Sequence, residues 1–202
     1  MKRSPHNFSQ RAQEYLETLN GCFTAEHFAA IEHLASDLLE AWKKNRQVFI
    51  CGNGGSAANA LHISNDFHYG IGAAHHKKEN YPGLRVEALT SNVAVISCLA
   101  NDTGYENIYS NQLKVKANSS DLLIALSGSG NSPNIIKALE SARELKMNSY
   151  AILAFDGGKS KDLADHAIHF KVNDMQIAED TQLVIGHICM QWLNENNPQI
   201  GQ

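Results

Sequence analysis

The architecture of this chain follows from one stretch, Val48-Phe49-Ile50-Cys51-Gly52-Asn53-Gly54-Gly55-Ser56. An apolar run leads straight into a glycine-rich turn, and good helix formers follow it from Ala57 to His62. This order is typical of a buried parallel strand, a tight turn and the start of a helix. The free N–H groups of such a helix face an anion, and Ser56 adds a hydroxyl. The turn has neither GxGxxG spacing nor a P-loop lysine, so it favours a phosphate monoester. The alternative is a turn that needs glycine only to be tight.

The composition fits a single α/β domain. The chain has 202 residues, is 43% hydrophobic and carries a net charge of −4. This length can bury a sizeable core, and the slight acidity predicts neither a nucleic-acid partner nor a membrane surface. No apolar run reaches the roughly 18 residues of a membrane span, and the first residues lack the apolar segment of a signal peptide. The 4 cysteines form no CxxC motif, which predicts reduced thiols in a cytoplasmic protein.

Predicted strands alternate with predicted helices after a helical beginning. The strands are expected at 48–51, 84–89, 121–126, 149–154 and 167–172. The helices are expected at 9–19, 24–44, 56–67, 91–99, 105–115, 134–145 and 178–193. This alternation predicts an α/β fold, a parallel five-stranded sheet with helices on both faces.

We expect one domain over residues 1–202, with a helical N-terminal extension in 1–45 and the α/β core in 46–197. The extension has no strand to cross over from. It therefore packs outside the sheet, or against another subunit, or covers the edge of the sheet.

A second loop strengthens the case for a phosphate site. Three serines, two glycines and an asparagine follow the strand at 121–126, in the order Ser127-Gly128-Ser129-Gly130-Asn131-Ser132. Open α/β sheets bind ligands at the carboxyl ends of their strands. Two hydroxyl-rich loops at that edge predict a neutral cradle of hydroxyl and N–H groups around a phosphate.

Two histidines are candidates for the chemistry. His62 and Asp66 are four residues apart, so they share one face of the helix that starts at the glycine turn. This spacing suits a divalent metal or an acid–base pair, whereas the alternative is a surface contact. His187 lies beside Gly186 in an apolar helix, where the alternative is a core histidine. No role is predicted for His6, His27, His33, His68, His75, His76, His166 and His169.

Taken together, these motifs resemble the sugar isomerase (SIS) domain and, within it, the phosphoheptose (sedoheptulose 7-phosphate) isomerase family. The resemblance covers about residues 20–195. It depends on the order and spacing of Cys51–Ser56, His62, Asn101-Asp102, Ser127–Ser132, Asp156-Gly157-Gly158 and Ile185-Gly186-His187.

The resemblance implies a flavodoxin-like SIS fold and an aldose–ketose isomerase of the cytoplasm. The implied reaction converts sedoheptulose 7-phosphate into D-glycero-D-manno-heptose 7-phosphate for lipopolysaccharide or capsule heptose synthesis. The resemblance further implies a homotetramer with active sites between its subunits, and one zinc ion, or another divalent metal ion, in each subunit. Matching positions imply catalysis by Asp66 and His187 and metal ligation by His62, Asp66, Glu179 and His187. The implied substrate contacts are Asn53, Gly54, Gly55, Ser56, Asp66, Asn101, Asp102, Ser127, Gly128, Ser129, Ser132 and Glu179.

Three positions depart from the family pattern. The family has glutamate where this chain has Asp66 and glutamine where it has Glu179, and its arginine is missing at Tyr69-Gly70. Eight residues separate Glu179 from His187, about 12 Å along a straight helix. One ion can join them only if both side chains are extended or if Glu179 precedes the regular helix.

Two other functions fit the same motifs. A non-catalytic SIS protein, such as a replication-initiation partner or a sugar-phosphate sensor, needs the phosphate loops but no acid–base pair. An isomerase of six-carbon sugar phosphates is the other alternative. The presence of both His62 and His187 favours an enzyme.

Overall fold

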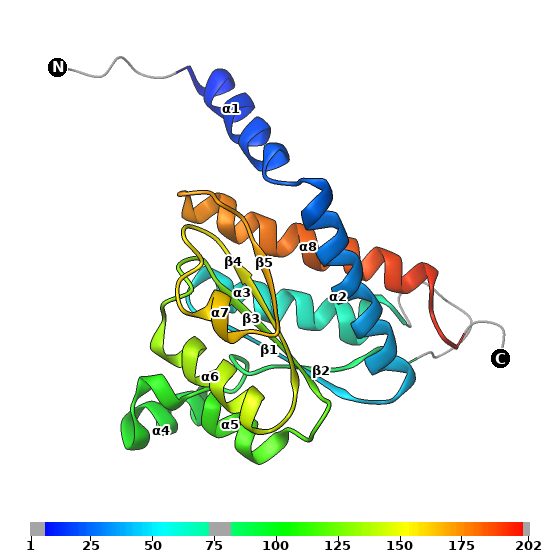
Figure 1. Ribbon diagram of the computed structural model, residues 1–202, viewed down its shortest axis with the longest axis vertical. Coiled ribbons are helices and arrows are strands. Elements are labelled where there is room, and N and C mark those ends of the chain that lie inside the picture. The colour runs from blue at the N-terminus through cyan, green and yellow to red at the C-terminus, as the bar shows by residue number, and fades with distance from the viewer. Residues whose placement is uncertain (1–6, 73–81, 200–202) are drawn as a thin grey trace.

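The computed structural model describes residues 7–72 and 82–199 (Figure 1). Its strands are β1 (Gln47–Gly52), β2 (Arg85–Ala88), β3 (Leu122–Ser127), β4 (Asn148–Leu153) and β5 (His166–His169). They form one parallel sheet in the order β2-β1-β3-β4-β5. The predicted five-stranded sheet is confirmed, and its strand order is the flavodoxin-like one.

The α-helices are α1 (Phe8–Gly21), α2 (Ala25–Lys43), α3 (Gly55–Asn65), α4 (Val93–Thr103), α5 (Ser110–Lys116), α6 (Pro133–Glu144), α7 (Ser160–Leu163) and α8 (Met175–Glu195). A π-helix, η1 (Asp66–Gly70), continues α3, and a 3₁₀ turn, η2 (Tyr105–Asn107), precedes α5. No helix in the described ranges is both long and apolar enough to cross a membrane.

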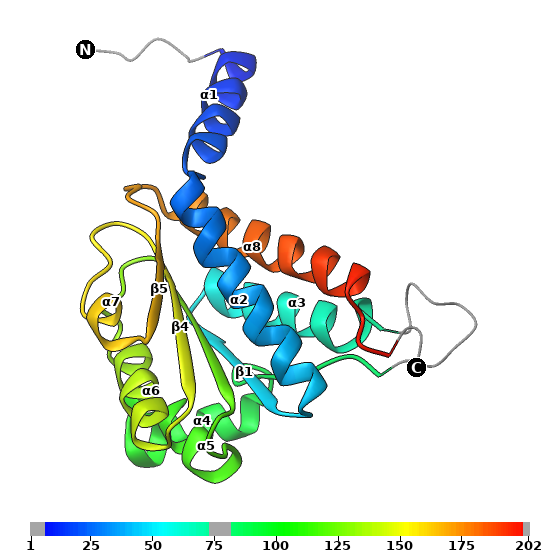
Figure 2. The same ribbon diagram turned by 45° about the vertical axis from the view of Figure 1, so that its right-hand side comes forward.

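Two apolar layers explain why the central strands read as continuous hydrophobic runs. In β1, Val48 and Ile50 pack into the layer with α2, α3 and α8. Phe49 and Cys51 alternate with them and pack into the other layer, with α5 and α6. Figure 1 and Figure 2 show these helices on opposite faces of the sheet. A strand buried on both faces carries apolar side chains at every position, as seen here.

The first two helices behave differently. α2 buries Ile31, Leu34 and Leu38 in the core, so it covers one face of the sheet. None of the residues of α1 is buried within the described part of the chain, and this helix projects from the body (Figure 2). A hydrogen bond of 2.6 Å from the Tyr15 hydroxyl to Asp180 of α8 fastens its side. Of the expected placements, α2 therefore covers the sheet and α1 lies outside it.

Several helix boundaries differ from those expected. α4 begins at Val93 and not at position 91 as expected, because the Asn92 side chain caps it by accepting a bond of 3.1 Å from the Val95 N–H. α4 continues through Thr103, beyond the end expected at position 99, and Gly104 ends it with a φ of 94°. The single helix expected over 105–115 is divided into η2 and α5. The segment between the helix expected at 56–67 and the strand expected at 84–89 lies mostly outside the described residues.

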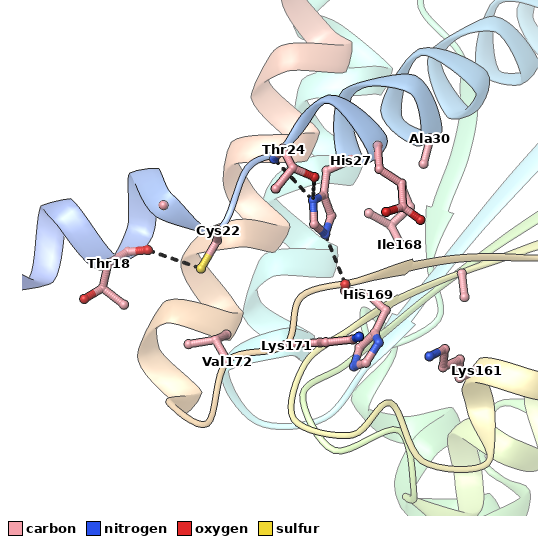
Figure 3. Close-up of a pocket in the computed structure, with 13 residues that line it drawn as sticks. Thr18, Cys22, Thr24, His27, Ala30, Lys161, Ile168, His169, Lys171 and Val172 are labelled. Carbon is pink, nitrogen blue, oxygen red and sulfur yellow. Dashed lines mark hydrogen bonds between the residues drawn. The ribbon is translucent and has the colours of Figure 1, made fainter.

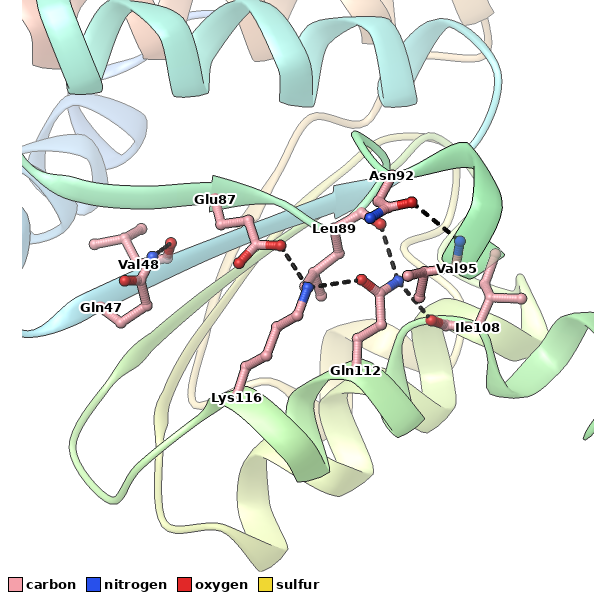
Figure 4. A network of polar contacts seen from close by, with 9 residues as sticks. All are labelled: Gln47, Val48, Glu87, Leu89, Asn92, Val95, Ile108, Gln112 and Lys116. Carbon is pink, nitrogen blue, oxygen red and sulfur yellow. Dashed lines mark hydrogen bonds and ion pairs between the residues drawn. The ribbon is translucent and has the colours of Figure 1, made fainter. Parts of the chain in front are cut away.

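A polar network fastens α5 to the edge strand β2 (Figure 4). Lys116 donates to Glu87 at 2.5 Å and to Gln112 at 3.1 Å. Gln112 in turn donates to the carbonyl groups of Leu89 and Ile108. The network holds the segment that follows β2 against the sheet.

Candidate functional site

The glycine turn after β1 forms a helix N-terminus, as predicted. Gly54 is the N-cap of α3 and has a φ of 55°, which favours glycine. A side chain at Gly52 would start 2.6 Å from the Ser56 carbonyl oxygen. Asn53 forms a reciprocal amide pair with Asn134 of α6, at 2.9 and 2.8 Å. These contacts fix the shape of the turn at the carboxyl end of β1.

The serine loop after β3 lies beside this turn. The Ser127 hydroxyl oxygen accepts a bond from the Gly130 N–H at 3.1 Å, and Ser129 accepts from Asn131 at 3.3 Å. Ser132 is the N-cap of α6 but makes no side-chain capping bond. Because backbone N–H groups use the acceptor sites of Ser127 and Ser129, their hydroxyl protons are available to an anion.

One cavity of about 260 Å³ joins the two loops. It is lined by Asn53, Gly54, Gly55, Ser56, Leu126, Ser127, Gly128, Ser129, Ser132, Met175 and Glu179. Hydroxyl groups and the N-terminus of α3 converge on it, which is the arrangement that binds a phosphate. The predicted glycine and serine positions are thus brought together at one edge of the sheet.

Removal of the serine hydroxyls tests the cradle. We expect Ser127→Ala and Ser129→Ala each to weaken the binding of a sugar phosphate by about 1–3 kcal/mol, the range for hydrogen bonds to a charged group. Calorimetric titration with the sugar phosphate measures the change. Ser119→Ala, in the turn before β3, is the control. Unchanged affinity in the Ser127→Ala/Ser129→Ala double variant would contradict the cradle.

A second group of side chains stands one to three helical turns from the glycine turn. The Nε2 atoms of His62 and His187 are 2.9 Å apart. Oδ2 of Asp66 is 3.4 Å from His62 Nε2 and 3.6 Å from His187 Nε2. Ligand atoms placed about 2.1 Å from a tetrahedral zinc ion stand about 3.4 Å from one another. The three residues therefore fit one divalent ion.

Local structure explains this assembly. The backbone changes from α to π geometry at Asp66, and the Ile71 N–H bonds to the Asp66 carbonyl at 3.1 Å. Such π turns are rare and occur often at functional sites. A side chain at Gly186 would start 2.7 Å from the Ile63 side chain, so only glycine lets α8 approach α3 this closely. The close approach brings His187 to His62, and half of each imidazole stays exposed. The alternative of a core histidine at 187 is wrong.

Polar side chains that sequence reasoning missed lock the same two helices together. Asn59 of α3 donates to the Glu179 carbonyl at 2.9 Å and to Gln182 at 3.0 Å. Gln182 donates to the Ser56 hydroxyl at 3.1 Å. Asn59 and Gln182 are buried. Each is a polar residue on a helix face that is otherwise apolar, and this pattern could have identified them in the sequence.

Glu179 does not join the histidine group. α8 begins at Met175, where Asp174 caps it, and not at Ala178 as expected, so Glu179 lies inside the regular helix. Its carboxylate lies against Gly55 and lines the cavity between the two loops. The possible ion group in this part of the described chain consists of His62, Asp66 and His187. The geometry thus supports the substrate-side role implied for Glu179 and separates it from the metal ligands.

The negative charge of Glu179 leads to a prediction with a definite sign. A carboxylate beside a bound phosphate repels it, so Glu179→Gln should tighten the binding of sugar phosphate by about 1 kcal/mol, or roughly fivefold. The gain should shrink at high salt. Calorimetric titration at two ionic strengths measures both effects. Glu195→Gln, at the exposed end of the same helix, is the matched control. Weaker binding by Glu179→Gln would contradict the repulsion.

Asn101 and Asp102 are not brought to this cavity. Both are exposed on α4, and Asn101 donates to Asp102 at 2.7 Å. A larger cavity, of about 620 Å³, lies between the junction of α1 and α2 and strand β5 (Figure 3). It contains none of the predicted site residues, and at its wall His27 bonds to the His169 carbonyl at 3.1 Å.

Comparison with known proteins identifies the family and the fold. The family model of the SIS domain matches residues 8–154. The chain is 34% identical to a phosphoheptose isomerase of Aneurinibacillus thermoaerophilus over 165 residues, 82% of this chain and 80% of the relative. It is 35% identical to the phosphoheptose isomerase of Trichlorobacter lovleyi over 81% of each chain. A solved phosphoheptose isomerase from Francisella tularensis shares the fold, with a TM-score of 0.82, 23% identity and coverage of 94% of this chain and 100% of that one.

Proposed function

This chain belongs to the phosphoheptose isomerase family of SIS-domain proteins, and we propose that it interconverts the ketose and aldose forms of a seven-carbon sugar phosphate. One observation carries the proposal: His187 of α8 meets His62 and Asp66, which lie along the helix whose N-terminus lines the cavity between the two loops. Gly55 and His62 are seven residues apart, about 10 Å along the helix. This separation suits an open-chain sugar with its reacting carbons and its phosphate at opposite ends.

The residues divide the work by position. Ser127, Ser129 and the N-terminus of α3 bind the phosphate and orient the chain. Both short distances to the imidazoles use Oδ2 of Asp66, which leaves Oδ1 for the substrate. In the direction from ketose to aldose, Asp66 removes a proton from C1 and an enediol forms. The proton returns to C2, while His187 moves a proton between the two oxygens, as general acid–base catalysis requires.

A metal completes this proposal. His62, Asp66 and His187 would hold a divalent ion, and zinc accepts this set of nitrogen and oxygen donors. Such an ion would polarise the carbonyl and would stabilise the negative charge that develops on oxygen. The proton carried by His187 is then at Nδ1, because its Nε2 faces His62.

The assembly and location also belong to the proposal. Phe8 and Leu16 of α1 are 85% and 64% exposed, which supports a homotetramer in which α1 packs on another copy. Sedimentation as a monomer at micromolar concentration would contradict it. Cys51 and Cys189 are free, and burial raises the pKa of both thiols to about 12, so they stay protonated at neutral pH. Inert free thiols support a cytoplasmic location.

The direct test is incubation of the purified protein with sedoheptulose 7-phosphate, followed by detection of an aldose heptose 7-phosphate. A six-carbon ketose phosphate serves as the comparison substrate. Turnover of the seven-carbon sugar alone supports the proposal. If the protein binds the sugar phosphate but turns over neither substrate, it is a binding module, the alternative that both its assembled histidine group and its relatives disfavour.

A further inference from the structure

A second cluster of two histidines and one aspartate lies at the end of the sheet where the strands begin, opposite the glycine turn and the serine loop. The ligand atoms of His33, Asp37 and His166 all lie within 4.8 Å of one another. Within residues 7–72 and 82–199, this cluster and the group at His62 are the two sets of three or more such residues that could hold an ion. None of its three members was given a role by the sequence.

The fold builds the two clusters in the same way. His33 and Asp37 are four residues apart on α2, as His62 and Asp66 are on α3. The third member comes from a distant element, because His166 is the first residue of β5. The His33 and His166 rings have centroids 4.5 Å apart. All strands of a parallel sheet begin at the same end of the sheet and finish at the opposite end. Because His166 begins β5, this cluster lies at the opposite end of the sheet from the glycine turn and the serine loop.

Two neighbouring side chains fix the carboxylate. The Tyr150 hydroxyl donates to Oδ2 of Asp37 at 2.7 Å, and the Asn148 amide donates to the same oxygen at 2.6 Å. The Tyr150 hydroxyl also contacts Nδ1 of His33. Both donors to Asp37 use Oδ2, which leaves Oδ1 for a ligand. Hydrogen bonds of this kind orient the residues that bind metals in proteins.

We propose that His33, Asp37 and His166 bind a second divalent transition-metal ion, of the zinc class. Two imidazoles and one carboxylate are ligands that zinc prefers, and they leave a fourth position for water. The ion would join α2, which precedes the sheet in sequence, to β5, a strand of four residues at the edge of the sheet. The alternative is a hydrogen-bonded cluster of His33, Tyr150 and Asp37 that takes no metal.

The test counts zinc ions in a chain that has lost the first group. In the background His62→Ala/His187→Ala, equilibrium dialysis against micromolar Zn²⁺ and elemental analysis should find one zinc per chain. Adding His33→Ala should reduce this value to zero. Because the His33 side chain is 54% exposed, its loss leaves the fold intact, which circular dichroism checks. The control is His68→Ala in the same background, which removes another exposed histidine and should keep one zinc.

A conservative variant tests the geometry. Tyr150→Phe keeps all three ligands and removes the hydroxyl that orients Asp37, so zinc affinity should fall about 10- to 100-fold. Zinc should also raise the melting temperature of the background chain, and the rise should vanish with His33→Ala. A background chain that binds no zinc, or binds it equally with His33→Ala, would overturn the site. Because the measurement is metal content and not turnover, it is independent of the proposed isomerase activity.

Discussion

Asp66→Asn is expected to lower turnover by about 100- to 10,000-fold while the fold and the binding of sugar phosphate stay intact. An amide oxygen can still face a metal ion but cannot accept the proton from C1, so the loss falls on the chemical step. The phosphate contacts lie about one helix length away, at the N-terminus of α3, so KM should change little. Steady-state kinetics with sedoheptulose 7-phosphate, together with metal analysis, measures the separation.

Two control variants sharpen this test. Asp66→Glu keeps a carboxylate and introduces the glutamate that the family pattern has at this position. This variant should therefore retain much of the activity. Asp162→Asn makes the same chemical change at an exposed position on α7 and should have no effect. If Asp66→Asn isomerises at the wild-type rate, the base lies elsewhere.

The His187→Ala variant is expected to lose the bound metal. Its turnover should fall by about 100- to 10,000-fold, or by more because the metal is lost as well. Its side chain is 49% exposed, so its removal creates no core cavity of the kind that lowers stability by several kcal/mol. The melting temperature of the metal-free variant should therefore match that of the metal-free parent. Turnover, metal content and melting temperature are measured on one preparation.

His62→Ala should give the same result, and the double variant should be hardly worse than either single one. Residues that act as one unit show such non-additive losses. The opposite pattern, lower stability with normal turnover in the folded fraction, would assign His187 a structural role only.

The strands and the two polar loops that line the cavity could be predicted because each depends on local chemistry. A strand such as β3, buried on both faces, needs an unbroken apolar run, and the sequence from Leu122 to Leu126 supplies it. Glycines and serines directly after such runs have few structural uses other than tight turns and anion sites. The order of the loops along the chain then places them at one edge of the sheet.

The site geometry depended on features without a local signature. No residue around Asp66 marks a π turn in the sequence. The turn packs on α8, and a side chain at Gly70 would start 2.8 Å from the end of the Met190 side chain. The start of α8 was misplaced because the capping role of Asp174 was not recognised, and this error left the position of Glu179 open.

The second cluster was missed for a different reason. Most strands of the sheet lie between His33 and His166 in the sequence. Taken alone, His33 is an ordinary exposed histidine and His166 an ordinary half-buried one. Only the spacing of His33 and Asp37 carried a local signal, and it equalled that of His62 and Asp66. What distinguishes these two pairs from an ordinary histidine–carboxylate contact is a third residue beside each, which only the tertiary structure supplies.

The contact between Gly186 and Ile63 has a consequence for how relatives of this chain can diverge. A side chain at position 186 would start 2.7 Å from the Ile63 side chain, so position 186 cannot gain bulk while position 63 keeps it. An ancestor that gained a methyl group at position 186 would keep its histidines in reach only if position 63 had already lost bulk. Among relatives that conserve both histidines, the two positions should therefore show inherited, compensating changes in volume, and the order of those changes should place the smaller residue at 63 first.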